Sequence, residues 1–76
     1  MFKMYPNPND GNFTIELSDL HSGKVRIAIS DLNGRIIYSN ELTGEIMPLT
    51  INIPAGIYNL KIESGQHSFN QKLIIR

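Results

Sequence analysis

Apolar and polar residues alternate along most of this chain, and turn residues interrupt the alternation about every 10 positions. Phe13, Ile15 and Leu17 fall on one side of an extended segment, and the same period recurs at residues 25–29, 49–53 and 58–62. A period of two gives a strand one apolar face, whereas a helix requires spacings of three and four. No window of ten residues supplies the helical spacing. The chain is therefore predicted to be all-β.

Short turns are predicted to join the strands. Asn33-Gly34 favours the positive φ angles of a tight hairpin turn, and Ser64-Gly65 is expected to join the last two strands in the same way. We expect strands at residues 12–18, 24–30, 35–42, 47–53, 57–63 and 67–75, with a short seventh strand before Pro6. Antiparallel strands with one apolar face each cover those faces by packing as two sheets. The expected fold is a small immunoglobulin-like antiparallel β-sandwich of six or seven strands, and a five- or six-stranded barrel is the alternative.

Composition excludes several classes of protein. The 76 residues include seven basic and seven acidic side chains and no cysteine. This length fits one domain, and zero net charge argues against a nucleic-acid partner. The absence of cysteine excludes a disulfide framework and a thiolate metal site. No apolar run approaches the length of a membrane span. The start shows no signal-peptide pattern, which indicates a cytosolic protein or part of a longer one.

Residues capable of chemistry are few and scattered. The imidazoles of His21 and His67 lie outside any metal-ligand spacing. Asp19, His21 and Ser22 share one loop, where neighbouring residues seldom reach nucleophile–base geometry. The segment 31–34 resembles part of a calcium loop but is too short for one, so a hairpin turn is the preferred interpretation. We predict no catalytic, metal or cofactor site, and therefore no enzyme.

Some residues are candidates for a binding surface instead. Ile37, Ile57 and Ile74 depart from the alternation and are expected to face outward, as a docking surface or under a neighbouring strand. Tyr5 and Tyr38 have no settled position, so an immunoglobulin-like adhesion or carbohydrate-binding module stays open as an alternative function. The other aromatic residues considered are expected in the core: Phe13, Tyr58 and Phe69. An exposed edge strand would also permit weak self-association.

The order of several short motifs is typical of a known family. The motif residues are Tyr5, Pro6, Asn7, Pro8, Gly11, Phe13, Asp31, Gly34, Arg35, Gly56 and Tyr58. The closing residues are Lys72, Leu73, Ile74, Ile75 and Arg76. In this order and spacing the chain resembles, over about residues 4–76, the type A C-terminal sorting domain of the type IX secretion system of Bacteroidota. Residues 51–55 depart from the stretch that often precedes the Gly-x-Tyr element in this family.

The resemblance implies a folded secretion signal without a cofactor. Residues 5–76 would be the sorting domain, and residues 1–4 a linker remnant or an added start. Such a domain follows an N-terminal cargo, passes through the periplasm and meets an outer-membrane translocon. A sortase-like peptidase then usually removes it, and the cargo reaches the cell surface or the extracellular space.

The resemblance also implies roles for individual residues. Residues 72–76 are the candidate segment for recognition by the translocon, with Lys72, Ile74 and Arg76 outward and Leu73 and Ile75 in the core. The motif residues before them are expected to shape the backbone. Pro6 and Pro8 would give an extended, stiff start, Gly34 and Gly56 would allow turns closed to residues with a Cβ, and Tyr58 would supply a large inward side chain.

Overall fold

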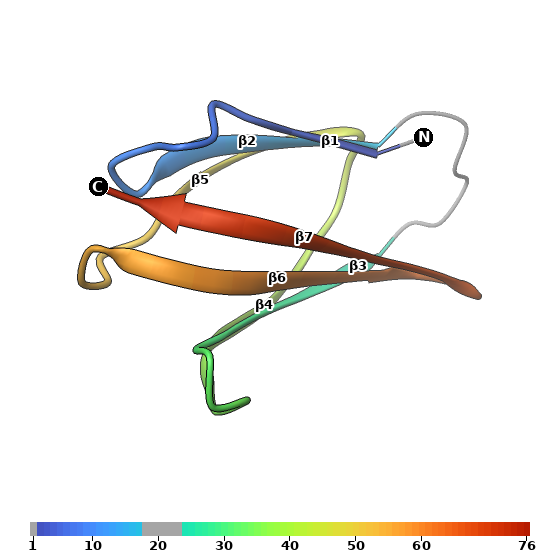
Figure 1. Cartoon of the computed structure of the whole chain (residues 1–76). Helices are drawn as coiled ribbons and strands as arrows, with labels where there is room; N and C mark the ends of the chain where they lie inside the picture. The colour runs from blue at the N-terminus through green and yellow to red at the C-terminus, as the bar shows by residue number, and fades with distance from the viewer. Residues whose placement is uncertain (1, 18–23) are drawn as a thin grey trace.

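Two antiparallel sheets pack face to face in this protein (Figure 1), whose computed structural model describes residues 2–17 and 24–76. The strands are β1 (Phe2–Tyr5), β2 (Asn12–Leu17), β3 (Val25–Ser30), β4 (Ile36–Leu42), β5 (Ile46–Thr50), β6 (Gly56–Ser64) and β7 (His67–Ile75). One sheet has the order β1-β2-β5 and the other β4-β3-β6-β7. The predicted small β-sandwich is confirmed, and the strands do not close into the alternative barrel.

The core lies between the sheets and is built from the alternating apolar residues. Its buried members are Phe13, Ile15, Leu17, Val25, Ile27, Ile29, Met47, Leu49, Ile51, Tyr58, Leu60, Ile62, Leu73 and Ile75. Each fully buried aliphatic side chain contributes roughly 1.5–3 kcal/mol relative to exposure. The period of two in the sequence therefore predicted the inner face of β2, β3 and β6 correctly.

Strand β5 is shorter than predicted, because its partner strand β2 does not extend beyond Asn12. Thr50 lies opposite Asn12, the first residue of β2, so the ladder ends there and does not continue to residue 53. The alternation persists beyond the ladder, since Ile51 is buried. Pro48 sits within β5 opposite Thr14, on an edge strand, where the missing N–H of proline costs no ladder hydrogen bond.

A bulge changes which side chains of β4 face the core. Ile29 lies opposite Tyr38, but the next residue, Ser30, lies opposite Ile36, so Ile37 is the extra residue in β4. Ile37 packs against the core and Ile36 is 63% exposed. The expectation that Ile37 faces outward is wrong, because a bulge shifts the alternation by one residue.

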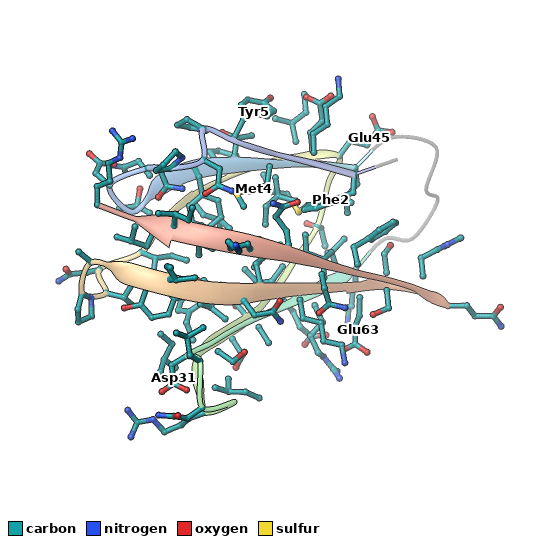
Figure 2. All side chains as sticks on the ribbon, viewed as in Figure 1. Phe2, Met4, Tyr5, Asp31, Glu45 and Glu63 are labelled. Carbon is teal, nitrogen blue, oxygen red and sulfur yellow. The ribbon has the colours of Figure 1, made fainter. Side chains whose placement is uncertain are left out.

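Strand β1 is the seventh strand expected before Pro6. It pairs with β2 from Phe2 opposite Leu17 to Tyr5 opposite Thr14, so residues 2–4 are strand residues. Figure 2 shows Phe2 and Met4 on the side of β1 toward the other sheet and Tyr5 on the opposite side. Phe2 stacks on Phe69 of β7 with ring centroids 5.5 Å apart. The start of the described chain is thus packed against its last strand.

Candidate recognition site at the end of the last strand

The last five residues, 72–76, lie at the end of β7, which is an edge strand of the four-stranded sheet. Leu73 is fully buried and Ile75 is 4% exposed, as expected. Lys72 and Arg76 are exposed, while Ile74 is half-buried. Of the five candidate residues, the two cationic side chains are therefore the most accessible to a partner.

The loop at residues 6–11 runs along the outer edge of this segment. The Asn7 side chain donates from Nδ2 to the carbonyl oxygen of Lys72 at 2.8 Å and accepts at Oδ1 from the backbone N–H of Ile74 at 3.0 Å. One side-chain amide thus makes the donor and acceptor bonds that a neighbouring strand would make. The N-terminal and C-terminal motifs, 65 and 67 residues apart at these contacts, form one site.

Asn9 continues this pairing with its backbone. Its N–H donates to the carbonyl oxygen of Ile74 at 3.0 Å, and its own carbonyl oxygen accepts from the N–H of Arg76 at 2.8 Å. The Asn9 side chain is buried and turned into the loop, where it donates to the Pro6 carbonyl oxygen at 2.9 Å and accepts from the Gly11 N–H at 2.8 Å. The side chain fixes the shape of the loop while the backbone extends the sheet.

The two prolines do not give an extended start, which corrects the sequence-based expectation. The Tyr5–Pro6 and Asn7–Pro8 peptide bonds are both cis, and the loop folds back onto β7. Gly11 closes the loop with a φ of +108°. A Cβ there would lie 2.3 Å from the Ile51 carbonyl oxygen, and the Ile51 N–H donates to the Gly11 carbonyl oxygen at 2.8 Å. The loop therefore bonds to β7 and to Ile51, the residue after β5, and only glycine fits at this point.

The motif residues at the β3–β4 turn serve the turn itself. Asp31 accepts at Oδ1 from the N–H groups of Asn33 and Arg35, at 2.9 and 3.0 Å, and its carbonyl oxygen accepts from the Gly34 N–H at 3.0 Å. The Arg35 N–H, as the first cause, holds the pKa of Asp31 below its ordinary value. Gly34 has a φ of +87°, as the hairpin interpretation requires. This carboxylate caps a hairpin turn and is not arranged as part of a calcium loop.

The Gly-x-Tyr element has a packing role. Tyr58 is 8% exposed and its hydroxyl donates to the Pro54 carbonyl oxygen. Gly56 starts β6, and a Cβ there would meet the Tyr58 side chain at 3.5 Å, an ordinary contact distance. The expectation that Gly56 sits in a turn closed to other residues is therefore wrong. Phe13 is buried at 3% exposure, as predicted.

The aromatic residues do not form a flat binding platform. Tyr5 is 44% exposed and is the single exposed Phe or Tyr among residues 2–17 and 24–76. Its hydroxyl donates to Glu16 Oε2 at 3.0 Å, and this hydrogen bond, as the first cause, raises the pKa of Tyr5. Tyr38 is half-buried, with its hydroxyl accepting from Asn40 at 3.3 Å. Phe69, predicted inward, packs partly buried against the core. Stacking against a sugar would have to rely on Tyr5 alone.

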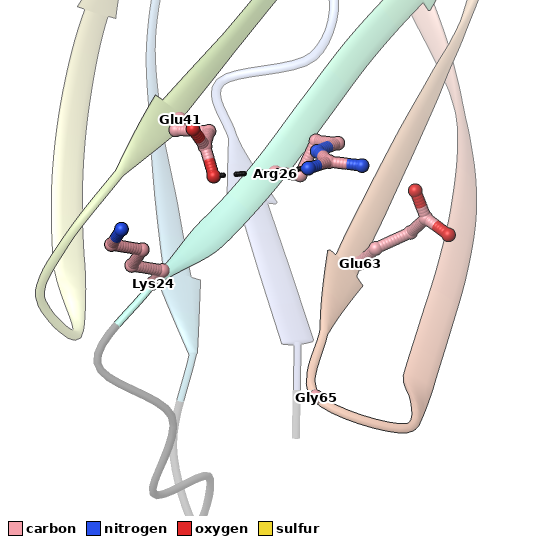
Figure 3. A pocket seen from close by; sticks show the side chains of 5 residues that line it. All are labelled: Lys24, Arg26, Glu41, Glu63 and Gly65. Atoms are coloured by element: carbon pink, nitrogen blue, oxygen red, sulfur yellow. Dashed lines mark ion pairs between the residues drawn. The ribbon is translucent and has the colours of Figure 1, made fainter.

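A shallow polar hollow lies on the outer face of the four-stranded sheet (Figure 3). It has a volume of about 270 Å³ and is lined by Lys24, Arg26, Glu41, Glu63 and Gly65. Arg26 Nη2 lies 3.9 Å from Glu41 Oε2, and both side chains are more than half exposed. Such an exposed pair contributes little to stability. Binding pockets for small molecules are mostly apolar, and this hollow is lined by charges of both signs.

The residues considered for catalysis are not assembled in the part of the chain described. Asp19, His21 and Ser22 lie outside the described residues. His67 is exposed at the start of β7, and its ring stacks on that of Phe69 with the ring centroids 6.4 Å apart. Within residues 2–17 and 24–76, no group of three or more His, Cys, Asp or Glu residues could hold a metal ion. These residues also contain no helix with the length and hydrophobicity that a membrane crossing requires.

Sequence reasoning missed Asn9 and gave Asn7 no role of its own. The run Pro6-Asn7-Pro8-Asn9 alternates proline with asparagine. Its two amides are the signal that was available, because Asn can imitate a peptide group. The identity of the partner strand could not be found in the run.

A protein-family model matches nearly the whole of this chain. The family described as secretion system C-terminal sorting domain matches residues 3–76. Among curated proteins, no match is found.

Proposed function

The chain belongs to the family of secretion system C-terminal sorting domains, the sorting signals of the type IX secretion system, and on this premise we propose that residues 72–76 are the segment its machinery recognises. A sorting signal of this system directs export to the cell surface or the extracellular space. Domains of this kind are generally non-catalytic. The finer steps below are part of the proposal.

In this proposal the cargo precedes β1, and the recognised segment, residues 72–76, lies at the other end of the domain. In the proposed sequence of events, the fused protein crosses the periplasm and residues 72–76 meet the outer-membrane translocon. A sortase-like peptidase then cuts on the N-terminal side of β1. A peptidase needs an extended, unpaired backbone, and β1 is paired with β2 at each of its four residues. Cleavage within β1 would require the sheet to open first.

The exposure pattern at the end of β7 is the observation that carries the proposal. Leu73 and Ile75 are anchored in the core, which leaves Lys72 and Arg76 exposed on a fixed backbone. Fixed cations on a strand edge offer a partner both charge and unpaired side-chain donors. The alternative adhesion or carbohydrate-binding role has less support, because Tyr5 is the single exposed Phe or Tyr among the described residues.

The proposal is tested by export of a fusion protein. Residues 2–76 are fused to the C-terminus of a reporter with an N-terminal signal peptide, in a host that has the type IX system. We expect the reporter outside the cell. The double variant Lys72→Ala/Arg76→Ala should remain in the periplasm, while Lys61→Ala, which removes an exposed cation from β6, should be exported.

Two results would contradict the proposal in different ways. Retention of the wild-type fusion in the periplasm would contradict the sorting function. Normal export of the Lys72→Ala/Arg76→Ala variant would contradict recognition through residues 72–76 and leave the sorting function intact. Binding of the isolated domain to a glycan array would favour the alternative module.

A further inference from the structure

Four backbone groups at the end of β7 are bonded by two asparagines from the other end of the chain. They are the carbonyl oxygens of Lys72 and Ile74 and the N–H groups of Ile74 and Arg76. We propose that Asn7 and Asn9, here called the asparagine clasp, position the recognition segment, so that the N-terminal motif acts on sorting through the C-terminal one. This inference rests on the proposed recognition of residues 72–76 and adds the residues that hold them in place.

The end of β7 is both the end of a strand and the edge of a sheet, so bonds from the clasp can stabilise it. Terminal residues of a strand separate easily from a sheet, and an edge strand has N–H and C=O groups without a neighbour. β6 binds one side of β7, up to Gly56 opposite Ile75. The clasp binds the other side, at Ile74 through both its N–H and its carbonyl oxygen. With both sides bonded, Lys72 and Arg76 are held in one register and on one side of the strand.

The chemistry of the clasp is specific to asparagine at residue 7. The amide of Asn7 is a donor toward the Lys72 carbonyl oxygen and an acceptor toward the Ile74 N–H at once. Aspartate keeps the acceptor and lacks the donor, and alanine lacks both. The Lys72 carbonyl oxygen also accepts from the Gln71 side chain at 3.2 Å, so the bond unique to Asn7 is the one from Ile74. The exchange rate of the Ile74 amide therefore reports on the clasp.

Asn7 lies outside the core, so the loss of its side chain can be distinguished from unfolding. Asn7 is exposed, and its bonds lie on the outer edge of β7. Its loss leaves the β6–β7 ladder of nine residue pairs and the Phe2–Phe69 stack in place. The domain should then stay folded while the last residues of β7 open more often.

The experiment combines amide hydrogen exchange, measured by NMR on residues 1–76, with export of the reporter fusion. In Asn7→Ala, Ile74 should exchange about five- to tenfold faster, as for the loss of one hydrogen bond, while Ile62 in β6 is unchanged. Export should fall several-fold. Asn7→Asp should keep Ile74 within about twofold of wild type, because a carboxylate oxygen still accepts its N–H, and should retain more export than Asn7→Ala. The matched control is Asn52→Ala, an exposed asparagine whose side chain makes no hydrogen bond to the described residues.

Each outcome decides between the two proposals. Unchanged exchange of Ile74 in Asn7→Ala overturns the clasp. Normal export of Asn7→Ala, together with retention of Lys72→Ala/Arg76→Ala, overturns the clasp and supports the recognition segment. Normal export of both overturns the recognition segment and the clasp's role in sorting. If Ile62 also exchanges faster in Asn7→Ala, the comparison moves to Asn7→Asp, where a loss of Ile74 protection as large as in Asn7→Ala overturns the clasp.

Discussion

Gly11, the last residue of the loop at residues 6–11, lies beside the backbone of Ile51, where an added methyl group would collide with it. In Gly11→Ala the new Cβ would lie 2.3 Å from the Ile51 carbonyl oxygen, a distance that real Cβ atoms essentially never show. The neighbour is a main-chain atom, so no side-chain rotation relieves the contact. The φ of +108° is also a conformation that residues with a Cβ rarely adopt.

The expected loss follows from these two features. A residue forced into a sparsely populated backbone region costs on the order of 1–3 kcal/mol. Moving Gly11 away from Ile51 also breaks the 2.8 Å bond from the Ile51 N–H, which is worth about 1 kcal/mol. We expect Gly11→Ala to lower the free energy of unfolding by about 2–4 kcal/mol, from a total on the order of 4–11 kcal/mol for a chain of this size. The melting temperature should fall by roughly 10–30 °C.

Gly44 provides a matched control, because it shares the positive φ and lacks the contact. Its φ is +117°, and a Cβ there would meet nothing within 4 Å. Urea unfolding of Gly11→Ala and Gly44→Ala, followed by far-UV circular dichroism at 25 °C, gives the two free energies. Gly11→Ala should be the less stable by at least about 1 kcal/mol. Equal losses in the two variants would refute the reasoning, because the cost would then come from φ alone.

Two further predictions concern the core and the turns. Leu60→Ala, at a fully buried site, should lower the free energy of unfolding by about 2–5 kcal/mol in urea titrations, whereas Ile36→Ala, at a 63% exposed site, should change it by less than about 0.5 kcal/mol. Similar losses at both would contradict the assigned inner face. The pKa values of Asp31 and Asp10 lie below the ordinary 3.8, mainly through hydrogen bonds from the backbone N–H groups of Arg35 and Asn12. A lowered folded-state pKa stabilises the fold above the unfolded value, and this stability is lost as pH falls below about 4. Asp31→Asn should therefore lose less stability than wild type in urea titrations between pH 7 and pH 2, and an equal loss would show that Asp31 does not contribute.

Periodicity in the sequence was enough to predict most of the fold. The alternation at 13–17, 25–29 and 58–62 reports the two faces of a strand, which is a local property of extended backbone. The turns around Gly34 and Gly65 were predictable for the same reason, since both have positive φ. Part of the candidate site could also be predicted. Leu73 and Ile75 are buried while Lys72 and Arg76 are exposed, which is the same alternation in the last strand.

The structure departs from the sequence-based predictions where the outcome depends on contacts between residues of different strands or within the folded sheet. Ile37 faces the core because β4 carries one residue more than β3 at the bulge, and a register between strands leaves no periodic signal in either. Gly56 lies in a strand under Tyr58 because of packing between residues of the folded sheet.

By itself, the sequence determined the all-β fold, the inner face of each central strand and the outward cations of the last one, because burial acts on each strand through its own alternation. Only the tertiary structure decided that Asn7 and Asn9 bond the edge of β7. Polar groups at a sheet edge must find hydrogen-bond partners wherever the fold provides them. That partner lies some 65 residues away along the chain, where no local pattern could have indicated it.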